Sequence, residues 1–394
     1  MSKARSTGKY PDAYRRIESK IADGHCVVLD GGVSTELERV LKQDHHISDK
    51  GLWGTWALYH APYAVLEVHR RYVAAECDLI STNTWAIMSA PEMETHSMVE
   101  HTDLRHWLDV ARLGIGLARQ AVEEEGKTGQ CAVAFSVDGD ADGKKGLDRL
   151  QLLARVFEED PPDLIAMETM TLIRDGLTLP AVEIMLGTGL PVWLSFRRCR
   201  HGVCGVFGQH WGGPEGDLFG RAAGKFEEMG VGALSINCLP EDHVAGMISW
   251  LRDFTDMPLG AYPNLGRYLD PGWKFDDKIG PEEYAQLALG WRKEGAQIVG
   301  GCCGVTPDHM KAVRAKLEDT KPGRQRPNFA DRRASRAVDS SEHQHRPSRT
   351  HKPWVDERDR VLFPVPFPEI VCDSEVFRPT QGSFLIWKHL FHSG

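Results

Sequence analysis

The 394-residue chain lacks several features that would place it in a specialised class. No apolar run approaches the roughly 20 residues needed to cross a bilayer, and residues 1–10 lack the apolar core of a secretory signal. The net charge of −9 offers no basic face for phosphates and argues against a general nucleic-acid binder. Nine cysteines are too sparse for a disulfide scaffold and odd in number, so we expect a reducing, cytoplasmic setting.

Eight short apolar stretches alternate with segments of helical character. Strands joined by helices form parallel sheets, and eight such units close a barrel, so the sequence predicts a (β/α)8 TIM-type barrel with its active site at the strands' C-terminal ends. The predicted strands are residues 26–32, 79–85, 131–137, 163–169, 191–196, 232–238, 259–264 and 297–301. The predicted helices are residues 10–23, 64–76, 99–125, 174–186, 218–229, 241–254, 281–294 and 307–317.

The barrel is predicted to occupy residues 1–320, after which the composition changes. Residues 321–360 hold eleven Lys or Arg against six Asp or Glu, with many Ser, Pro and His, and we interpret them as a flexible, low-complexity basic linker. Residues 361–394 form a short apolar C-terminal tail. The tail either docks on the barrel or on a partner subunit, which would give a homo-oligomer, or is poorly ordered.

Two adjacent cysteines, Cys302 and Cys303, follow an apolar stretch and lie between glycines. Thr306 is a favourable N-cap and Pro307 suits the first helical position, so a helix is predicted directly after them. The positive end of that helix favours thiolate over thiol. Cys238 ends another predicted strand, and three thiolates from two strand ends would form a zinc site with an open fourth position.

The alternative is that these cysteines are small core residues, because free cysteine is among the most buried residue types. Adjacent residues on a regular strand point to opposite faces, so Cys302 and Cys303 reach one metal only if the backbone leaves strand geometry there. The flanking Gly301 and Gly304 permit such a change. Three other cysteines near strand starts or helix ends are assigned to the core: Cys26, Cys77 and Cys131.

A zinc ion with three thiolate ligands has a net negative formal charge and is a weak Lewis acid. Its use is to bind an incoming thiol at the open position, remove the thiol proton and keep the sulfur nucleophilic. This chemistry suits alkyl transfer to sulfur, whereas a site that activates water more often has His ligands and a general base. Because water would compete with the thiol, we expect a dry pocket.

Two carboxylates stand at predicted strand ends, Asp30 at the first and Glu168 at the fourth. Facing one pocket, they would hold an α-ammonium group; the alternatives are a helix N-cap or a loop ion pair. Asn237 and Asn264 either orient polar substrate groups or close turns. Three tryptophans either line a site for a cationic donor or pack in the core and rim: Trp53, Trp56 and Trp85.

With these residues in view, the chain resembles the homocysteine S-methyltransferase family over roughly residues 12–320. The Gly-Gly-Cys-Cys-Gly motif at residues 300–304, paired with the earlier Asn237-Cys238, is specific to that family. Weaker matches are residues 30–32, 35–36, 82–85, 167–169 and 262–264.

The resemblance implies a barrel enzyme that uses Zn²⁺ to transfer a methyl group to homocysteine, forming methionine. The zinc ligands that it implies are Cys238, Cys302 and Cys303. It places the α-amino group of the amino acid against Asp30 and Glu168, with backbone N–H groups near Gly31 and Gly32 helping to position it. The partners are then two small molecules, the thiol and the methyl donor.

The donor is inferred from what the chain lacks at two positions. Trp53 fits one wall of the aromatic box of betaine-using members, but Ala86 and Thr169 fall where tyrosines would be expected. This favours a sulfonium donor, S-methylmethionine or S-adenosylmethionine, over betaine. Residues 135–140 and 197–216 depart from the family pattern beside the pocket, so another thiol or a selenol is an alternative acceptor.

Two other classes of function remain as alternatives. One is a non-catalytic barrel that binds zinc or a thiol and has a regulatory role. The other is a metal-independent lyase that uses Glu168 as its base.

Overall fold

The computed structural model describes residues 10–41, 52–94, 106–171, 173–199, 202–204, 210–212, 216–265, 267–269, 272–274 and 279–323. The chain divides into two compact units, Met1–Gln325 and Arg326–Gly394, and every described residue belongs to the first. The predicted linker lies outside the described residues from residue 324 on, and so does the predicted tail with its proposed role in oligomerisation.

Eight parallel strands form one sheet in the order β1-β13-β10-β9-β5-β4-β3-β2. They are β1 (Val27–Val28), β2 (Leu79–Ser81), β3 (Ala132–Asp138), β4 (Leu164–Met170), β5 (Val192–Phe196), β9 (Ala233–Pro240), β10 (Leu259–Asn264) and β13 (Ile298–Val299). The sheet closes on itself where Leu29 bridges Leu79 and the Asp30 N–H donates to the Leu79 carbonyl at 3.0 Å. The predicted (β/α)8 barrel is confirmed.

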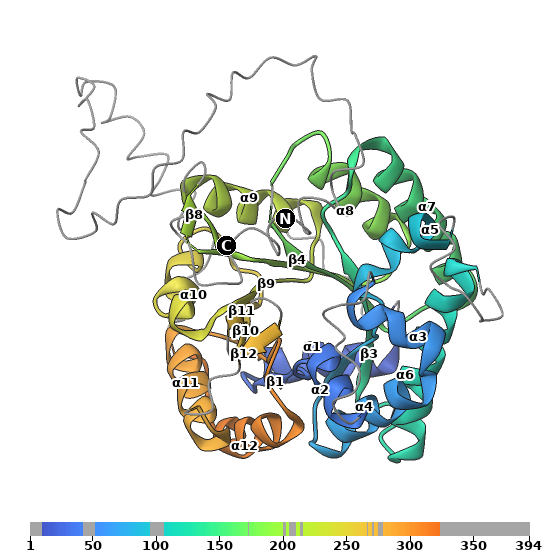
Figure 1. Ribbon diagram of the computed structural model, residues 1–394. Coiled ribbons are helices and arrows are strands. Elements are labelled where there is room, and N and C mark those ends of the chain that lie inside the picture. Colours follow the sequence, from blue (N-terminus) through green and yellow to red (C-terminus); the bar gives the residue numbers. More distant parts are fainter. Residues whose placement is uncertain are drawn as a thin grey trace, which may run out of the picture. The chain divides into compact units, whose positions relative to one another are not determined.

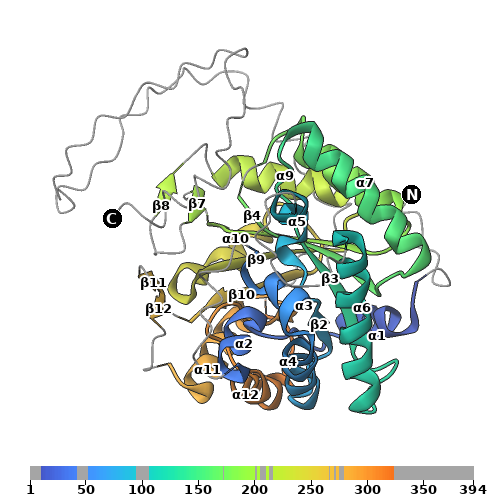
Figure 2. The ribbon, with the colours of Figure 1, turned by 45° about the vertical axis from the view of Figure 1, so that its right-hand side comes forward.

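Helices surround the strands on all sides in both views (Figures 1 and 2). The longer ones are α1 (Asp12–Ala22), α2 (Val33–Val40), α4 (Pro62–Ala74), α6 (Trp107–Glu124), α7 (Gly143–Glu159), α8 (Thr178–Gly187), α9 (Gly216–Met229), α11 (Pro281–Glu294) and α12 (Pro307–Leu317). Short helical segments are η2 (Trp53–Thr55), α3 (Trp56–His60), η3 (Trp85–Ser89), α5 (Ala90–Glu94), η4 (Glu241–Val244) and α10 (Met247–Leu251).

Among the longer helices, the predictions are confirmed with two omissions and one division. Sequence analysis did not identify α2 or α7. The helix predicted over residues 241–254 is divided into η4 and α10. Two small antiparallel sheets extend from the ends of β5 and β10: β6 (Arg198–Cys199), β7 (Gly202–Cys204) and β8 (His210–Gly212), and β11 (Arg267–Leu269) with β12 (Gly272–Lys274).

The strand residues alternate between two cores, as expected for side chains that point to opposite faces. On β3, Val133 and Phe135 pack outward against the helices, whereas Ala132 and Ala134 belong to a separate cluster inside the barrel. Helix α1 contributes to this inner cluster, and the Trp193 Nε1–H donates to the Tyr14 hydroxyl at 3.1 Å. The N-terminal end of the barrel is therefore filled by packed side chains, which leaves the C-terminal end for a site.

A buried carboxylate joins elements at the N-terminal end of the barrel. Asp78 accepts hydrogen bonds from the Lys20 ammonium, from the Arg314 guanidinium and, at 2.9 Å, from the Val28 backbone N–H. These contacts connect α1, β1 and α12 to the loop before β2. The charges are paired and hydrogen bonded, which is the condition under which a carboxylate tolerates burial.

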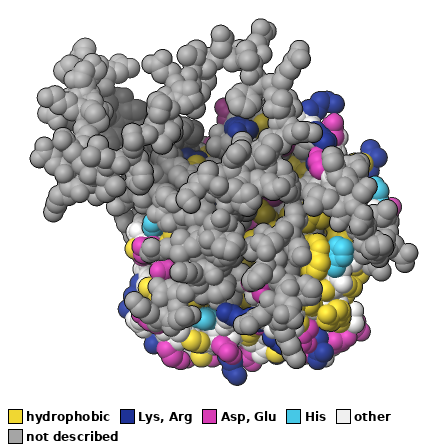
Figure 3. Space-filling model, viewed as in Figure 1, with side chains coloured by type: hydrophobic (Ala, Val, Ile, Leu, Met, Phe, Trp, Pro, Cys, Tyr) yellow, Lys and Arg dark blue, Asp and Glu magenta, His cyan; other side chains and the backbone are white. Residues whose placement is uncertain are grey.

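On the face shown in Figure 3, acidic and basic side chains are interspersed along the lower part of the described surface. Among the described residues, no helix is both long enough and apolar enough to span a membrane.

Candidate active site

Three thiols meet at the C-terminal end of the barrel. Strand β13 ends at Val299, so Cys302 and Cys303 lie beyond it. They are therefore outside regular strand geometry, which would have pointed their side chains to opposite faces. Their sulfur atoms are 4.0 Å apart. The Cys238 thiol, at the end of β9, is hydrogen bonded to both. Cys238 and Cys303 are buried and Cys302 is partly exposed, so the cluster borders on solvent at one residue.

The distance between the Cys302 and Cys303 sulfurs is close to that in a tetrahedral thiolate site. Ligands at the usual Zn–S length would be about 3.8 Å apart, against 4.0 Å between Cys302 and Cys303. As they stand, the thiols contact one another, and no three His, Cys, Asp or Glu side chains of the described residues have the geometry of a metal centre. The donor set thus fits zinc in its chemistry, and the Cys302–Cys303 pair fits it in spacing.

The pKa values of the three thiols are shifted in different directions. Hydrogen bonds from Cys302 and Cys303 hold the pKa of Cys238 well below its usual value, and the nearby Arg197 guanidinium adds to this effect. Cys238 in turn raises the pKa of both partners. Arg197 directly follows β5 and is only 7% exposed, so its charge is held near the sulfurs. Sequence analysis did not identify this cation.

The backbone around the cysteine pair has the predicted form. Thr306 is the N-cap of α12, its hydroxyl accepts from the His309 N–H, and Pro307 is the first helical residue. Gly304 has a φ of +87°, in the left-handed region that favours glycine. Gly32 lies so close that a Cβ there would be 2.6 Å from the Cys302 carbonyl oxygen. These contacts fix the loop that bears the two thiols.

A bulge turns Cys238 toward the mouth of the barrel. Along β10, Tyr262 pairs with Asn237 and Asn264 pairs with Pro240, so β9 contains one extra residue at this point. Cys238 has a φ of +52°, which costs a non-glycine residue roughly 1–3 kcal/mol. Bulges commonly redirect a side chain beside an active site. The Asn264 Nδ2–H contacts the Cys238 sulfur at 3.9 Å, and Asn264 Oδ1 accepts from the Cys303 N–H at 3.2 Å.

Asp30 lies just after β1, where the sheet closes against β2, and is 2% exposed. Its carboxylate accepts from the Ser81 N–H at 2.7 Å and from the Ser81 hydroxyl at 3.1 Å. Burial, reinforced by the negative charge of Glu168, raises the pKa of Asp30 to about 8. The two predicted carboxylates are therefore close enough to interact, and a cation between them would favour their ionised forms.

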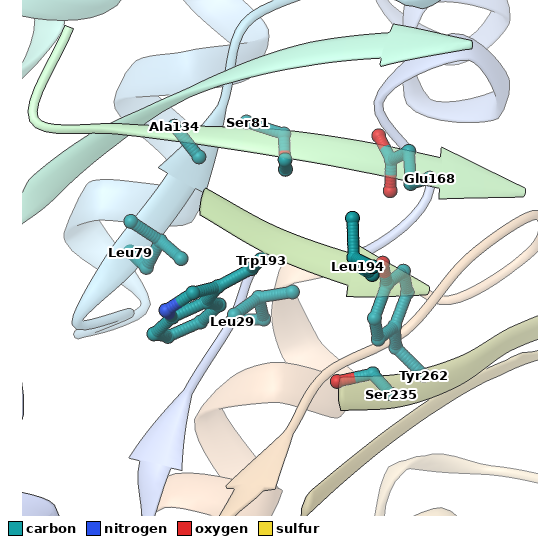
Figure 4. Close-up of a pocket in the computed structure, with 10 residues that line it drawn as sticks. Leu29, Leu79, Ser81, Ala134, Glu168, Trp193, Leu194, Ser235 and Tyr262 are labelled. Carbon is teal, nitrogen blue, oxygen red and sulfur yellow. The ribbon is translucent and has the colours of Figure 1, made fainter. Parts of the chain in front are cut away.

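Glu168 is partly exposed and lines a small cavity inside the barrel. Figure 4 shows Glu168 and Tyr262 at one end of this cavity, with Leu29, Leu79 and Trp193 at the other. The Ser136 hydroxyl donates to Glu168, and Tyr262 is hydrogen bonded to both Glu168 and Ser195. Burial raises the pKa of Glu168 to about 6, although the bonds from Ser136 and Tyr262 oppose the rise.

The side chain of Asn237 is hydrogen bonded to Thr169 in the interior of the protein. It is fully buried, its Oδ1 accepts from the Thr169 N–H at 3.2 Å, and its Nδ2–H donates to the Thr169 hydroxyl at 2.9 Å. The amide is thus engaged within the protein. Contact of Asn237 with the amino acid stays a prediction, and the bonds that the structure shows are to Thr169.

One of the two backbone N–H groups expected to help position the amino acid already has a partner within the protein. The Gly32 N–H donates to the Val305 carbonyl at 2.9 Å, so it is occupied. The role of the Gly31 N–H stays a prediction.

The three tryptophans named in the sequence analysis make different contacts. The Trp85 Nε1–H points to the Glu168 carbonyl at 3.4 Å, while Trp56 stacks on His60 at 4.5 Å. Segment η2, which contains Trp53, packs against η3, which begins at Trp85.

Polar side chains after β3, β4 and β5 form one side of the rim. Asp140 accepts from the Thr171 N–H at 2.7 Å and from the Thr171 hydroxyl, and Arg198 donates to the Thr171 carbonyl at 2.7 Å. Burial and the nearby Asp140 raise the pKa of Asp138 to about 8, against the opposing charge of Arg197. This rim is formed by the segments that depart from the family pattern.

Other cysteines lie in the core. Cys26, Cys77 and Cys131 are buried, and burial raises the pKa of each thiol above its usual value, as predicted for inert core residues. The seven cysteines whose side chains the structure describes are all free thiols.

Comparison with known proteins agrees with the site. The sequence model of the family described as homocysteine S-methyltransferase matches residues 27–317. Homocysteine S-methyltransferase 3 of Zea mays is 30% identical over 336 residues, covering 75% of this chain and 91% of its own. Selenocysteine Se-methyltransferase of Brassica oleracea var. italica is 28% identical over 326 residues, covering 75% of this chain and 89% of its own.

A crystal structure shares the fold. The metallated form of homocysteine methyltransferase MmuM from Escherichia coli superimposes with a TM-score of 0.55 at 21% identity, covering 76% of this chain and 99% of that chain. The family match covers most of the barrel, from β1 to α12. The chain belongs to the homocysteine S-methyltransferase family and is an enzyme of the methyltransferase type.

Proposed function

We propose that the protein transfers a methyl group from a sulfonium donor to the thiol of homocysteine, forming methionine, at a zinc ion held by Cys238, Cys302 and Cys303. The observation that supports this most directly is the contact of three thiols at the mouth of the barrel. Zinc bound there would lower the pKa of the acceptor thiol and keep its sulfur nucleophilic.

The protein's own side chains would orient the acceptor. The α-ammonium group is expected between the carboxylates of Asp30 and Glu168, whose raised pKa values fall when a cation binds. Ser81 holds the first carboxylate, and Ser136 and Tyr262 hold the second. These contacts fix the amino acid at one end, so its sulfur is directed toward the thiol cluster.

The reaction itself needs only alignment and exclusion of water. The acceptor sulfur's electron pair forms the new S–CH₃ bond while the donor's S–CH₃ bond breaks and its electrons return to the donor sulfur. The donor leaves as a neutral thioether, and the thiol proton leaves to solvent before the transfer. Because a thiolate and a cation react to give neutral products, a site with little water favours the transfer.

The donor is proposed to be S-methylmethionine or S-adenosylmethionine. A betaine site would require aromatic walls, and Ala86 and Thr169 supply no ring. The hydroxyl of Thr169 is bonded to Asn237 instead. Betaine therefore remains the less favoured donor.

The acceptor has one alternative that a relative supports. The Brassica oleracea enzyme named for selenocysteine matches about as well as the homocysteine enzymes. Selenocysteine belongs in the same assay for that reason.

The test combines metal analysis with a donor panel. Purified protein is analysed for zinc and then incubated with ¹³C-labelled homocysteine and each of S-methylmethionine, S-adenosylmethionine and betaine, and methionine that contains the label of homocysteine is measured by mass spectrometry. We expect about one zinc per chain and labelled methionine from a sulfonium donor. Zinc without turnover on any donor would instead indicate a non-catalytic barrel, and turnover without metal would contradict the zinc proposal.

Cysteine variants provide the matched comparison. Cys303→Ala is expected to remain folded and to lose zinc and turnover together. Cys131→Ala, which alters a buried cysteine at the start of β3, controls for the loss of any thiol and should retain both. Full activity in Cys303→Ala would refute the ligand assignment.

A further inference from the structure

The two halves of the proposed site stand on bulges in different strands. Along β5, Leu194 pairs with Met167 and Phe196 pairs with Met170, so β4 contains an extra residue beside Glu168. The bulge of β9 contains Cys238. Strand β5 lies between β4 and β9, so no backbone ladder connects the two bulges directly.

One side-chain amide connects them. The Asn237 Oδ1 accepts from the Thr169 N–H at 3.2 Å, and its Nδ2–H donates to the Thr169 hydroxyl at 2.9 Å. Asn237 is 0% exposed, so water does not compete for these bonds. The amide therefore reaches across β5 and holds both the backbone and the side chain of Thr169.

Both ends of this contact have strained backbone. Thr169 has a φ of +61° and the residue after Asn237, Cys238, has a φ of +52°. Non-glycine residues keep such a conformation only when their surroundings hold them there, and such strain often lies at functional sites. Thr169 directly follows Glu168, and Asn237 directly precedes Cys238. The two hydrogen bonds between Asn237 and Thr169 therefore connect the residue next to Glu168 with the residue next to Cys238.

We propose that Asn237 is a positioning residue, and that its clamp on Thr169 sets the distance between the Glu168 carboxylate and the Cys238 sulfur. The inference rests on the proposed function, because that distance matters for an acceptor that has both an ammonium group and a thiol. The clamp then selects thiol amino acids of one length, since the carboxylate holds the amino end and the cysteine cluster receives the sulfur.

Two substitutions at Thr169 test the clamp with little change of shape. Thr169→Val removes the hydroxyl that accepts from Asn237 but keeps the branched side chain, and Thr169→Ser keeps the hydroxyl. Each is assayed with homocysteine and with 4-mercaptobutanoate, which is homocysteine without its α-amino group. The ratio of the two kcat/KM values measures the coupling between the halves, and a general loss of folded enzyme cancels from it.

We expect the ratio to fall about tenfold in Thr169→Val, the worth of one buried hydrogen bond, and to remain at the wild-type value in Thr169→Ser. The loss should appear mainly in KM for homocysteine. An unchanged ratio in Thr169→Val, or equal losses in both variants, would overturn the clamp. A wild-type enzyme that methylates neither thiol would instead overturn the proposed function.

Zinc binding gives a readout that does not depend on turnover. Zn²⁺ alone is titrated into each metal-free protein in competition with a chromophoric chelator. Because the clamp also holds the backbone at Cys238, we expect binding to be weakened severalfold in Thr169→Val and preserved in Thr169→Ser. Equal affinities in all three proteins would count against a clamp that reaches Cys238.

Discussion

The ionisation of Glu168 is expected to control recognition of the acceptor's amino group. Burial raises the pKa of Glu168 to about 6, so its carboxylate forms as the pH rises through that value. The α-ammonium group of an amino acid stays protonated well above neutrality. Attraction between the two therefore increases from acid to neutral pH and does not reverse in that range.

The size of the effect follows from the pKa. About a tenth of the Glu168 carboxyls are ionised at pH 5 and about nine tenths at pH 7, so kcat/KM for homocysteine should rise about tenfold from this cause. The thiols also titrate, and 4-mercaptobutanoate reports their contribution because it has the thiol without the amino group. The ratio of the two profiles isolates the carboxylates that bind the ammonium group, Glu168 and Asp30, and comparison with a Glu168 variant separates the two.

The assay measures both acceptors across this pH range in the wild type and in Glu168→Gln. Loss of a charge-assisted hydrogen bond, about 1.5–3 kcal/mol, predicts a ten- to hundredfold lower kcat/KM for homocysteine at pH 7 in the variant. The tenfold rise of the ratio that comes from Glu168 should be absent in Glu168→Gln, which leaves only the contribution of Asp30. A ratio that is flat in the wild type, or that keeps the same slope in the variant, would refute the role of Glu168.

Two further predictions concern stability. His69 is fully buried on α4, and neither ring nitrogen has a hydrogen-bond partner among the described residues. Burial lowers the pKa of the ring to about 4. His69→Leu removes the two unsatisfied nitrogens and should therefore raise the free energy of unfolding by about 1–3 kcal/mol in urea titrations. The gain should grow as the pH falls from 6.5 toward 4, since the unfolded wild type then binds a proton that the folded state does not; a less stable variant would contradict this. Asp78→Ala leaves Arg314 and the Val28 N–H without this acceptor and should cost about 3–5 kcal/mol in thermal unfolding, and a loss below about 1 kcal/mol would show that the network is dispensable.

The barrel was predictable because its strands are buried on both faces. Each is a short, continuous apolar run, a pattern that sequence alone exposes. The helix after the cysteine pair was also predictable, since Thr306 and Pro307 are local signals that act within one turn. Helix α7 was missed because it begins with the polar stretch 143–146, although its later Leu150, Leu153 and Phe157 are apolar and buried.

The sequence predicts which residue types form the site, but not the backbone geometry that orients them. That Cys238, Cys302 and Cys303 meet follows from the parallel arrangement of strand ends. The bulges that orient Cys238 and Thr169 left no sequence signal, because neither residue is a glycine despite its positive φ. The partner of Asn237 could not be predicted either, because it is set by the register between distant strands.

The central claim is that three sulfurs hold one zinc ion and leave a position for the acceptor thiol. X-ray absorption spectroscopy at the zinc edge counts sulfur neighbours directly, before and after homocysteine is added. We expect three sulfurs at about 2.3 Å with one lighter ligand in the protein alone, and four sulfurs in the presence of homocysteine. A zinc environment with fewer than three sulfurs, or one that homocysteine leaves unchanged, would contradict the account.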